Sequence, residues 1–109
     1  MAPVTRDILF EVGQIVHHLR YGYRGLVIGY DATCKAGERW YEHQTKGKDY
    51  KPTKQQPWYH VLVDGATQQT YVAQQNLEPG DGRSPINHPM VRQNFATFLD
   101  GRYHRENLN

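Results

Sequence analysis

Histidine is the residue type in this 109-residue chain with the most obvious capacity for chemistry, because imidazole binds metals and titrates near neutral pH. The chain has six histidines, but none has the spacing of a zinc motif. His17 and His18 are adjacent in an expected strand, so their side chains point to opposite faces and cannot hold one ion. The sequence therefore favours structural histidines and predicts no metal and no other cofactor.

Cys34, the single cysteine, is the remaining candidate nucleophile. It follows a strand end, where catalytic groups do occur, but nothing in the sequence identifies a base or an oxyanion donor for it. Glu38 and Glu42, four residues apart, are typical of a solvated face rather than of an acid/base pair. Phosphate-binding and nucleophile-elbow motifs are also absent from the sequence. We therefore expect a protein that is not an enzyme, with Cys34 in a packing role.

Side chains suited to binding are concentrated between residues 20 and 54. This span holds eight Lys or Arg against four Asp or Glu, although the net charge of the whole chain is only +2. Arginine and tyrosine serve both phosphate binding and protein interfaces. A soluble turn at residues 20–24 is the plainer alternative. The residues that we expect to bind DNA or a partner are Arg20, Tyr21, Tyr23, Arg24, Lys46, Lys48, Lys51 and Lys54.

The expected binding residues begin at the tip of a predicted hairpin. Apolar runs at residues 13–16 and 26–28 are typical of strands, and Gly22 between them permits the positive φ of a tight turn. A second hairpin is predicted from residues 57–64 and 69–73, with Asp-Gly as its turn. Residues 33–57 are predicted to form a long irregular segment, pinned to the domain by Trp40 and Tyr41.

The C-terminal part predicts the only helix that we expect. Pro89 suits the first helical position, and Val91, Phe95, Phe98 and Leu99 form one apolar stripe that ends at Gly101. Short strands joined by hairpins favour a strongly bent antiparallel sheet, whose closure would remove its edges. The predicted fold is mainly β: a small SH3-like antiparallel barrel with one C-terminal helix.

Length and composition limit the organisation of the chain. The predicted organisation is an N-terminal tail, residues 1–9, and one domain, residues 10–109. Hydrophobic residues make up 38% of the chain, mean hydropathy is −0.83, and no apolar run is long enough to span a bilayer. The N-terminus lacks the pattern of a secretion signal, and one cysteine allows no internal disulfide. We expect a cytoplasmic protein that does not bind membranes.

Several blocks in order resemble one family, the YccV-like or heat-shock protein HspQ family of hemimethylated-DNA-binding proteins. Single blocks are weak signals, but the ordered set covers nearly the whole chain. The blocks are Phe10-Glu-Val-Gly-Gln-Ile-Val-His-His, Tyr21-Gly-Tyr-Arg-Gly-Leu-Val-Ile-Gly-Tyr-Asp, Cys34, Trp40, Gln56-Pro-Trp-Tyr-His-Val-Leu-Val-Asp, Tyr71-Val-Ala-Gln-Gln-Asn-Leu-Glu-Pro, and His88-Pro with Phe95 and Phe98.

This resemblance implies an SH3-like barrel and two functions. One is a non-enzymatic module that binds double-stranded, hemimethylated DNA. The alternative is a heat-shock adaptor or specificity factor for an ATP-dependent protease, acting through contacts with the protease or its substrates. The resemblance also implies self-association, with a trimer as one form. From the residues alone, the basic surplus permits binding through the DNA backbone. Sequence-specific reading is not supported, because the predicted C-terminal helix carries only Arg92 and Asp100 as charges and is a poor groove reader.

Overall fold

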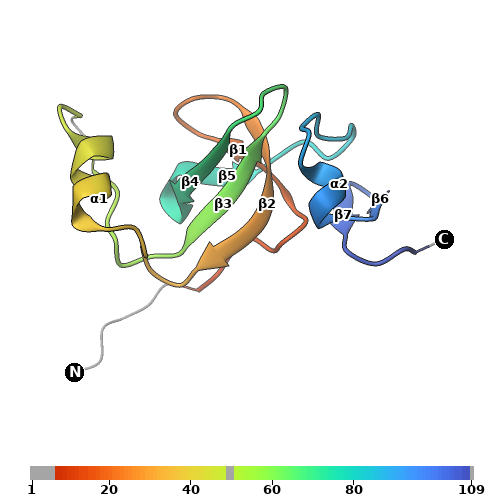
Figure 1. The fold of residues 1–109 in the computed structure, drawn as a ribbon, viewed down its shortest axis with the longest axis horizontal. Helices are drawn as coiled ribbons and strands as arrows, with labels where there is room; N and C mark the ends of the chain where they lie inside the picture. Colours follow the sequence, from red (N-terminus) through yellow and green to blue (C-terminus); the bar gives the residue numbers. More distant parts are fainter. Residues whose placement is uncertain (1–6, 49–50, 109) are drawn as a thin grey trace.

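The structure is a computed structural model that describes residues 7–48 and 51–108 (Figure 1). Strands dominate this part of the chain, so the mainly β class is confirmed. The elements in order are β1 (Ile15–His18), β2 (Arg24–Asp31), α1 (Glu38–Thr45), β3 (Trp58–Val63), β4 (Gln69–Ala73), the 3₁₀ turn η1 (Gln74–Asn76), β5 (Leu77–Pro79), α2 (Val91–Asn94), β6 (Thr97–Leu99) and β7 (Arg102–His104).

Five strands form one antiparallel sheet in the order β4-β3-β2-β1-β5, and β6 pairs with β7 separately. The pairing of β2 with β3 shifts between Val27 and Gly29, an irregularity that bends a sheet. β4 and β5 are not hydrogen-bonded to each other, so the sheet stays open. The predicted closure into a barrel is therefore not observed among the described residues, and β4 is an edge strand.

Both predicted hairpins are confirmed. β1 pairs with β2 around a turn in which Gly22 has φ 75°, and β3 pairs with β4 around a turn in which Gly65 has φ 77°. Glycine reaches this left-handed region without the steric cost that a Cβ would bring. Local turn chemistry thus sets the register of both hairpins.

Apolar side chains cover both faces of the five-stranded sheet. Neighbouring residues in each central strand point to opposite faces, as the pleat requires. One face holds Phe10, Val16, Val27, Tyr59, Val61, Val72 and Leu77, and the other holds Ile15, Leu26 and Leu62 packed against Ile86, Phe95 and Tyr103. Burial of one such side chain contributes about 1.5–3 kcal/mol to folding.

Residues 33–57 are not wholly irregular, because they contain the two-turn helix α1. Gly37 precedes it in an extended conformation and Glu38 lies in its first turn, where the helix dipole favours a negative charge. Trp40 lies 6.1 Å from Trp58 and 5.7 Å from Tyr71, ring centre to ring centre. The predicted pinning of this segment by an aromatic side chain is confirmed, but the pinned segment is a helix.

The predicted C-terminal helix is wrong in length. α2 has four residues, and Phe95 is already extended, with φ −140°. Phe98 lies in β6 and packs against Tyr103 of β7 at 4.6 Å between ring centres. Asp100 and Gly101 join β6 to β7 with φ 53° and 76°, as in a two-residue hairpin turn. A short helix and a strand therefore bury Phe95 and half-bury Val91 and Phe98, whereas Leu99 is exposed and Gly101 belongs to a hairpin.

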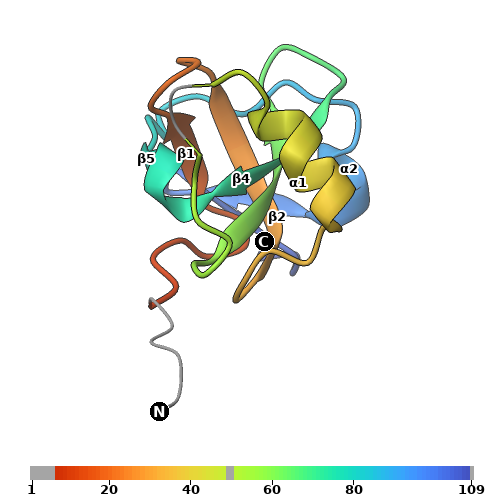
Figure 2. The same ribbon diagram turned by 90° about the vertical axis from the view of Figure 1, so that its left-hand side faces the viewer.

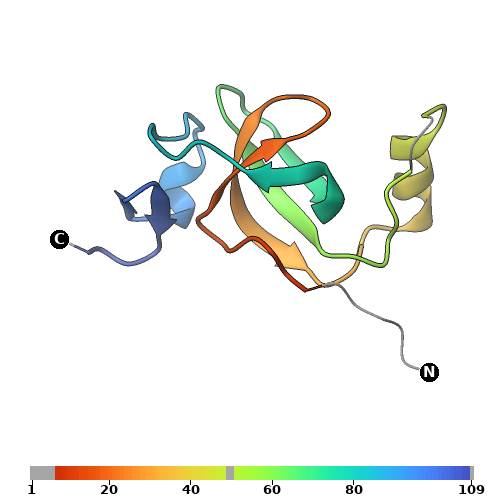
Figure 3. The same cartoon turned by 180° about the vertical axis from the view of Figure 1, so that it is seen from behind.

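The sheet lies between two small elements at opposite ends of the molecule, α1 at one end and α2 with β6 and β7 at the other (Figures 1 and 3). Gly13 connects the sheet to the C-terminal hairpin, since its N–H donates to the Val27 carbonyl and its own carbonyl accepts from the Tyr103 N–H. Figure 2 looks onto the α1 end, where the candidate site lies. Neither helix in the described residues has the length and apolarity needed to cross a membrane.

Candidate functional site

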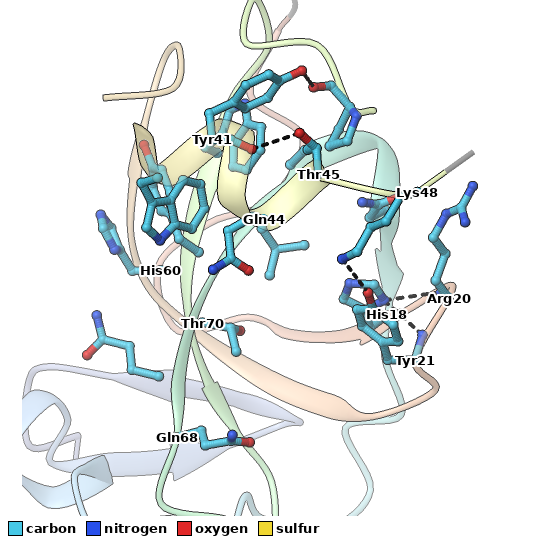
Figure 4. A pocket seen from close by; sticks show the side chains of 18 of the residues that line it. His18, Arg20, Tyr21, Tyr41, Gln44, Thr45, Lys48, His60, Gln68 and Thr70 are labelled. Atoms are coloured by element: carbon cyan, nitrogen blue, oxygen red, sulfur yellow. Dashed lines mark hydrogen bonds between the residues drawn. The ribbon is translucent and has the colours of Figure 1, made fainter. Parts of the chain in front are cut away.

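A groove of about 920 Å³ lies between α1, the β1–β2 turn and the edge strand β4, and we call it the α1–β4 groove (Figure 4). Four separate parts of the sequence build it, so no single motif reveals it. It is lined by His18, Arg20, Tyr21, Tyr23, Trp40, Tyr41, Gln44, Thr45, Gly47, Lys48, Pro52, Trp58, His60, Gln68, Gln69, Thr70, Tyr71, Val72, Ala73 and Asn76.

The charge of the α1–β4 groove is positive. None of the described residues that line it is aspartate or glutamate, whereas Arg20 and Lys48 both contribute cations. Tyrosine, tryptophan and amide side chains make up much of the remaining lining. A groove of this composition attracts anionic ligands and offers flat rings for stacking.

His18 organises the β1–β2 turn that presents Arg20 and Tyr21. Its Nδ1 accepts hydrogen bonds from the backbone N–H groups of both residues, each at 3.1 Å. Its ring is buried and stacks on Tyr21 with 4.7 Å between ring centres, and it packs beside Tyr23 at 5.0 Å. The turn is thus fixed by one imidazole that must keep Nδ1 unprotonated.

The pKa of His18 is lowered to about 4, first because burial disfavours the charged ring and then because His17, Arg20 and Lys48 are nearby cationic groups. The ring is therefore neutral at physiological pH. In the unfolded chain the pKa of histidine returns to about 6.5, so the unfolded state binds more protons between pH 6.5 and 4. Acidification through this range consequently destabilises the folded state, and the contribution is complete above pH 6.5.

We predict that the free energy of unfolding falls by roughly 1–3 kcal/mol through His18 between pH 7 and 4; partial hydration of the turn keeps the loss below the full linkage value. The matched control is His18→Asn, whose side-chain oxygen can accept the same two N–H groups without titrating. Denaturant unfolding at a series of pH values measures both proteins. As the pH falls, the free energy of unfolding of the native protein should decrease more than that of His18→Asn, so that the difference between them narrows or changes sign. Parallel pH profiles of the two proteins would contradict the role given to His18.

Lys48 connects the segment after α1 to the β1–β2 turn. Its Nζ donates to the Tyr21 hydroxyl at 2.9 Å and lies 5.6 Å from the centre of the Tyr21 ring. Tyr21 is nevertheless 64% exposed, so most of its ring remains available to a ligand. Figure 4 shows Lys48, Arg20, His18 and Tyr21 together on one side of the groove. This contact brings two of the predicted binding residues together from positions 27 residues apart.

Aromatic rings form the wall of the groove next to α1. Trp58 is buried and lies 5.3 Å from Tyr71 and 6.4 Å from Tyr41, ring centre to ring centre, and its Nε1 donates to the Thr53 carbonyl. The Tyr71 hydroxyl donates to Asp31 at 2.7 Å, and burial followed by this hydrogen bond raises the pKa of Tyr71. The contact between Tyr41 and Trp58 joins α1 to the sheet.

Three histidines besides His18 have polar partners. His17 pairs with Glu78 at 2.9 Å, on the sheet face opposite His18. His60 lies 3.5 Å from Asp31, and the Nε2 of His88 lies 3.0 Å from the Gln68 carbonyl. In the part of the chain that the structure describes, no three His, Cys, Asp or Glu side chains gather where they could hold a metal ion.

Comparison with known proteins identifies the family. Residues 8–102 match the family described as "Hemimethylated DNA-binding protein YccV like". The chain belongs to the YccV-like family. It is also similar to F-box only protein 21 of Pongo abelii and of Homo sapiens, at 36% identity over 99 residues, and of Mus musculus, at 35%. The matched region covers 90% of this chain but only 15–16% of those relatives.

In this YccV-like chain, four of the eight residues that we expected to bind line the α1–β4 groove, and two more adjoin lining residues in the sequence. Arg20, Tyr21, Tyr23 and Lys48 line it. Tyr23 is half-buried, and its hydroxyl forms a hydrogen bond with Thr70. Lys46 and Lys51 are exposed and neighbour the lining residues Gly47 and Pro52 along the chain.

The other two expected residues lie outside the groove lining of the YccV-like chain. Arg24 pairs with Asp64 at 2.9 Å and donates to the carbonyls of Asp81, Ser84 and Pro85. It therefore connects β2 to two loops. Lys54 pairs with Glu38 and lies 5.2 Å from the centre of the Tyr41 ring, on the α1 side. Both cations are engaged in contacts that stabilise the fold.

Sequence reasoning missed several residues of the YccV-like groove. Gln44 and Thr45 belong to the helix that was not predicted, and His18 was classed only as a structural histidine. Residues 69–73 were predicted as a strand, but not as an edge that faces a groove. The adjacent rings of Trp40 and Tyr41 were the signal available in the sequence for this wall.

Proposed function

We propose that this chain is a DNA-binding module that holds duplex DNA at the cationic side of the α1–β4 groove. The observation that carries the proposal is a groove whose described lining includes Arg20 and Lys48 and no carboxylate. The YccV-like family, described by binding to hemimethylated DNA, supports the same class of partner. In the F-box only relatives the matching segment is a small part of a longer chain, which fits a module.

The cations of the groove serve the DNA backbone in this proposal. Arg20 and Lys48 contact phosphates, and the exposed Lys46 and Lys51 extend the positive surface along the same segment. Each neutralised phosphate adds about 0.9 to the slope of log affinity against log salt. Four such contacts give a slope of about −3 to −4. Binding of this kind positions the duplex without reading its sequence.

Preference for a hemimethylated site needs contacts with a base edge and with a methyl group. Amide side chains read the edge of adenine, and apolar surfaces contact methyl groups in the major groove. The lining of the α1–β4 groove includes the amides of Gln44, Gln68 and Gln69 and the rings of Tyr21 and Trp40. We propose that these amides and rings supply the discrimination, while the four cations supply most of the affinity.

The test is a titration with three duplexes of one sequence: unmethylated, methylated on one strand and methylated on both. Fluorescence anisotropy at several salt concentrations measures affinity and slope. We expect the tightest binding for the hemimethylated duplex and a steep slope common to all three. Equal affinities with the same slope would reduce the proposal to backbone binding, and the absence of binding at low salt would overturn it.

A further inference from the structure

The edge strand β4 exposes backbone hydrogen-bonding groups along the α1–β4 groove. The Val63 N–H donates to the Gln68 carbonyl at one end of the β3–β4 ladder. At the other end, the Gln74 N–H donates to the Pro57 carbonyl. Antiparallel ladders alternate hydrogen-bonded and non-bonded pairs. Thr70 and Val72 therefore bond to β3, and the N–H and C=O groups of Gln69, Tyr71 and Ala73 point away from it.

The α1–β4 groove runs along this edge and includes side chains from both sheet faces. All five residues of β4 line it. Tyr71 packs with Trp58 and His60 on one face, whereas Thr70 bonds to Tyr23 on the other. Figure 4 shows the strand crossing the groove, with α1 on one side and the β1–β2 turn on another. An added strand would continue the sheet, and its side chains would alternate between these two linings.

We propose that β4 binds an extended acidic peptide segment of a partner protein as a sixth strand of the sheet. Backbone bonds to Gln69 and Tyr71, the outward-pointing residues of β4 that are not buried, supply affinity without sequence preference. The acidic character follows from the lining, in which the described charged groups are Arg20 and Lys48. Five residues of β4 correspond to about 17 Å of strand, which fits a segment of five or six residues. This inference goes beyond DNA binding and does not depend on it.

The probe is a capped, fluorescent hexapeptide of alternating valine and glutamate, compared with the same peptide carrying lysine in place of glutamate. We expect saturable binding of the glutamate peptide and at least about tenfold weaker binding of the lysine peptide, since like charges would face Arg20 and Lys48. Equal binding of the two peptides, or no binding of the glutamate peptide at millimolar concentration, would overturn the proposal.

Backbone N-methylation of the probe tests strand addition without changing the protein. One analogue is N-methylated at its odd residues and the other at its even residues. Only one of the two sets faces β4, because the amides of a strand alternate in direction. We expect one analogue to lose binding and the other to retain it. Equal affinity of both analogues, or equal loss, would contradict a sixth strand.

Gln69→Pro provides the matching change in the protein, since proline removes an outward N–H that β3 does not use. Gln69→Ala is the control because it removes the same side chain and keeps the N–H. We expect Gln69→Pro to weaken the hexapeptide about three- to tenfold relative to Gln69→Ala, with equal melting temperatures for the two variants. Identical peptide affinity of the two folded variants would overturn the assignment to β4.

Discussion

Charge reversal at the α1–β4 groove, Arg20→Glu with Lys48→Glu, is expected to lower the affinity for duplex DNA by about a hundredfold or more at low salt. The variant no longer neutralises two phosphates, and it brings two carboxylates into a groove whose described lining has none. The salt slope should become shallower by about 2, because each phosphate that a cation neutralises contributes about 0.9. Anisotropy titrations over a range of salt concentrations measure both quantities.

Arg92→Glu with Arg105→Glu is the matched control for this experiment. It makes the same change in net charge, from +2 to −2, with two exposed arginines at the opposite end of the molecule. We expect the control to keep most of the affinity and the full salt slope. If the two double variants weaken binding equally, DNA responds only to net charge and the groove has no special part in binding.

Trp58→Ala is expected to lower the free energy of unfolding by about 3–5 kcal/mol. Trp58 is 3% exposed and packs against the rings of Trp40, Tyr41 and Tyr71. Its removal leaves a cavity where α1 meets the sheet. α1 should therefore exchange its amide hydrogens faster than in the native protein, beyond the effect of lower global stability.

Trp58→Phe is the control for the loss of the ring, because it keeps an aromatic group in the same place. We expect a smaller loss of about 1–2 kcal/mol and protected amides in α1. Urea unfolding gives the stabilities, and hydrogen exchange of the α1 amides gives the local effect. An alanine variant that keeps both native stability and native protection of α1 would show that Trp58 does not hold the groove wall.

The central hairpins of the fold were predictable because their information is local. Gly22 and the Asp64-Gly65 pair specify turns, and the runs between them alternate as strands do. Sheet closure was not predictable in the same way. It depends on whether β4 and β5 meet, and these strands are short segments whose separation is set by packing of the whole domain.

The two helices show where the local sequence pattern leads to a wrong prediction. The spacing of Val91, Phe95 and Phe98 suits a helix, but a short turn followed by a strand buries the same side chains. α1 was missed because its sequence is polar, and its stability comes from contacts of Trp40 with rings on other strands. Tertiary packing determines the secondary structure of both segments, and these packing contacts cannot be read from a single sequence.

Residue type predicted which kinds of side chain line the candidate site better than it predicted which individual residues line it. Arg20 and Arg24 flank the same turn, yet Arg20 lines the groove and Arg24 bonds to Asp64 and three loop carbonyls. The turn directs the Arg20 and Arg24 side chains to different places. Arg24 pairs with Asp64 because the β3–β4 hairpin places Asp64 next to it. Charge identifies candidates, whereas the surrounding fold determines which cations face the groove.

Chemical-shift mapping of the amides during titration with a hemimethylated duplex tests the central claim most directly. The α1–β4 groove as the DNA surface predicts that the largest changes cluster at residues 20–23, 44–48 and 68–71. Largest changes at α2, β6 and β7, with the groove amides unmoved, would contradict the account.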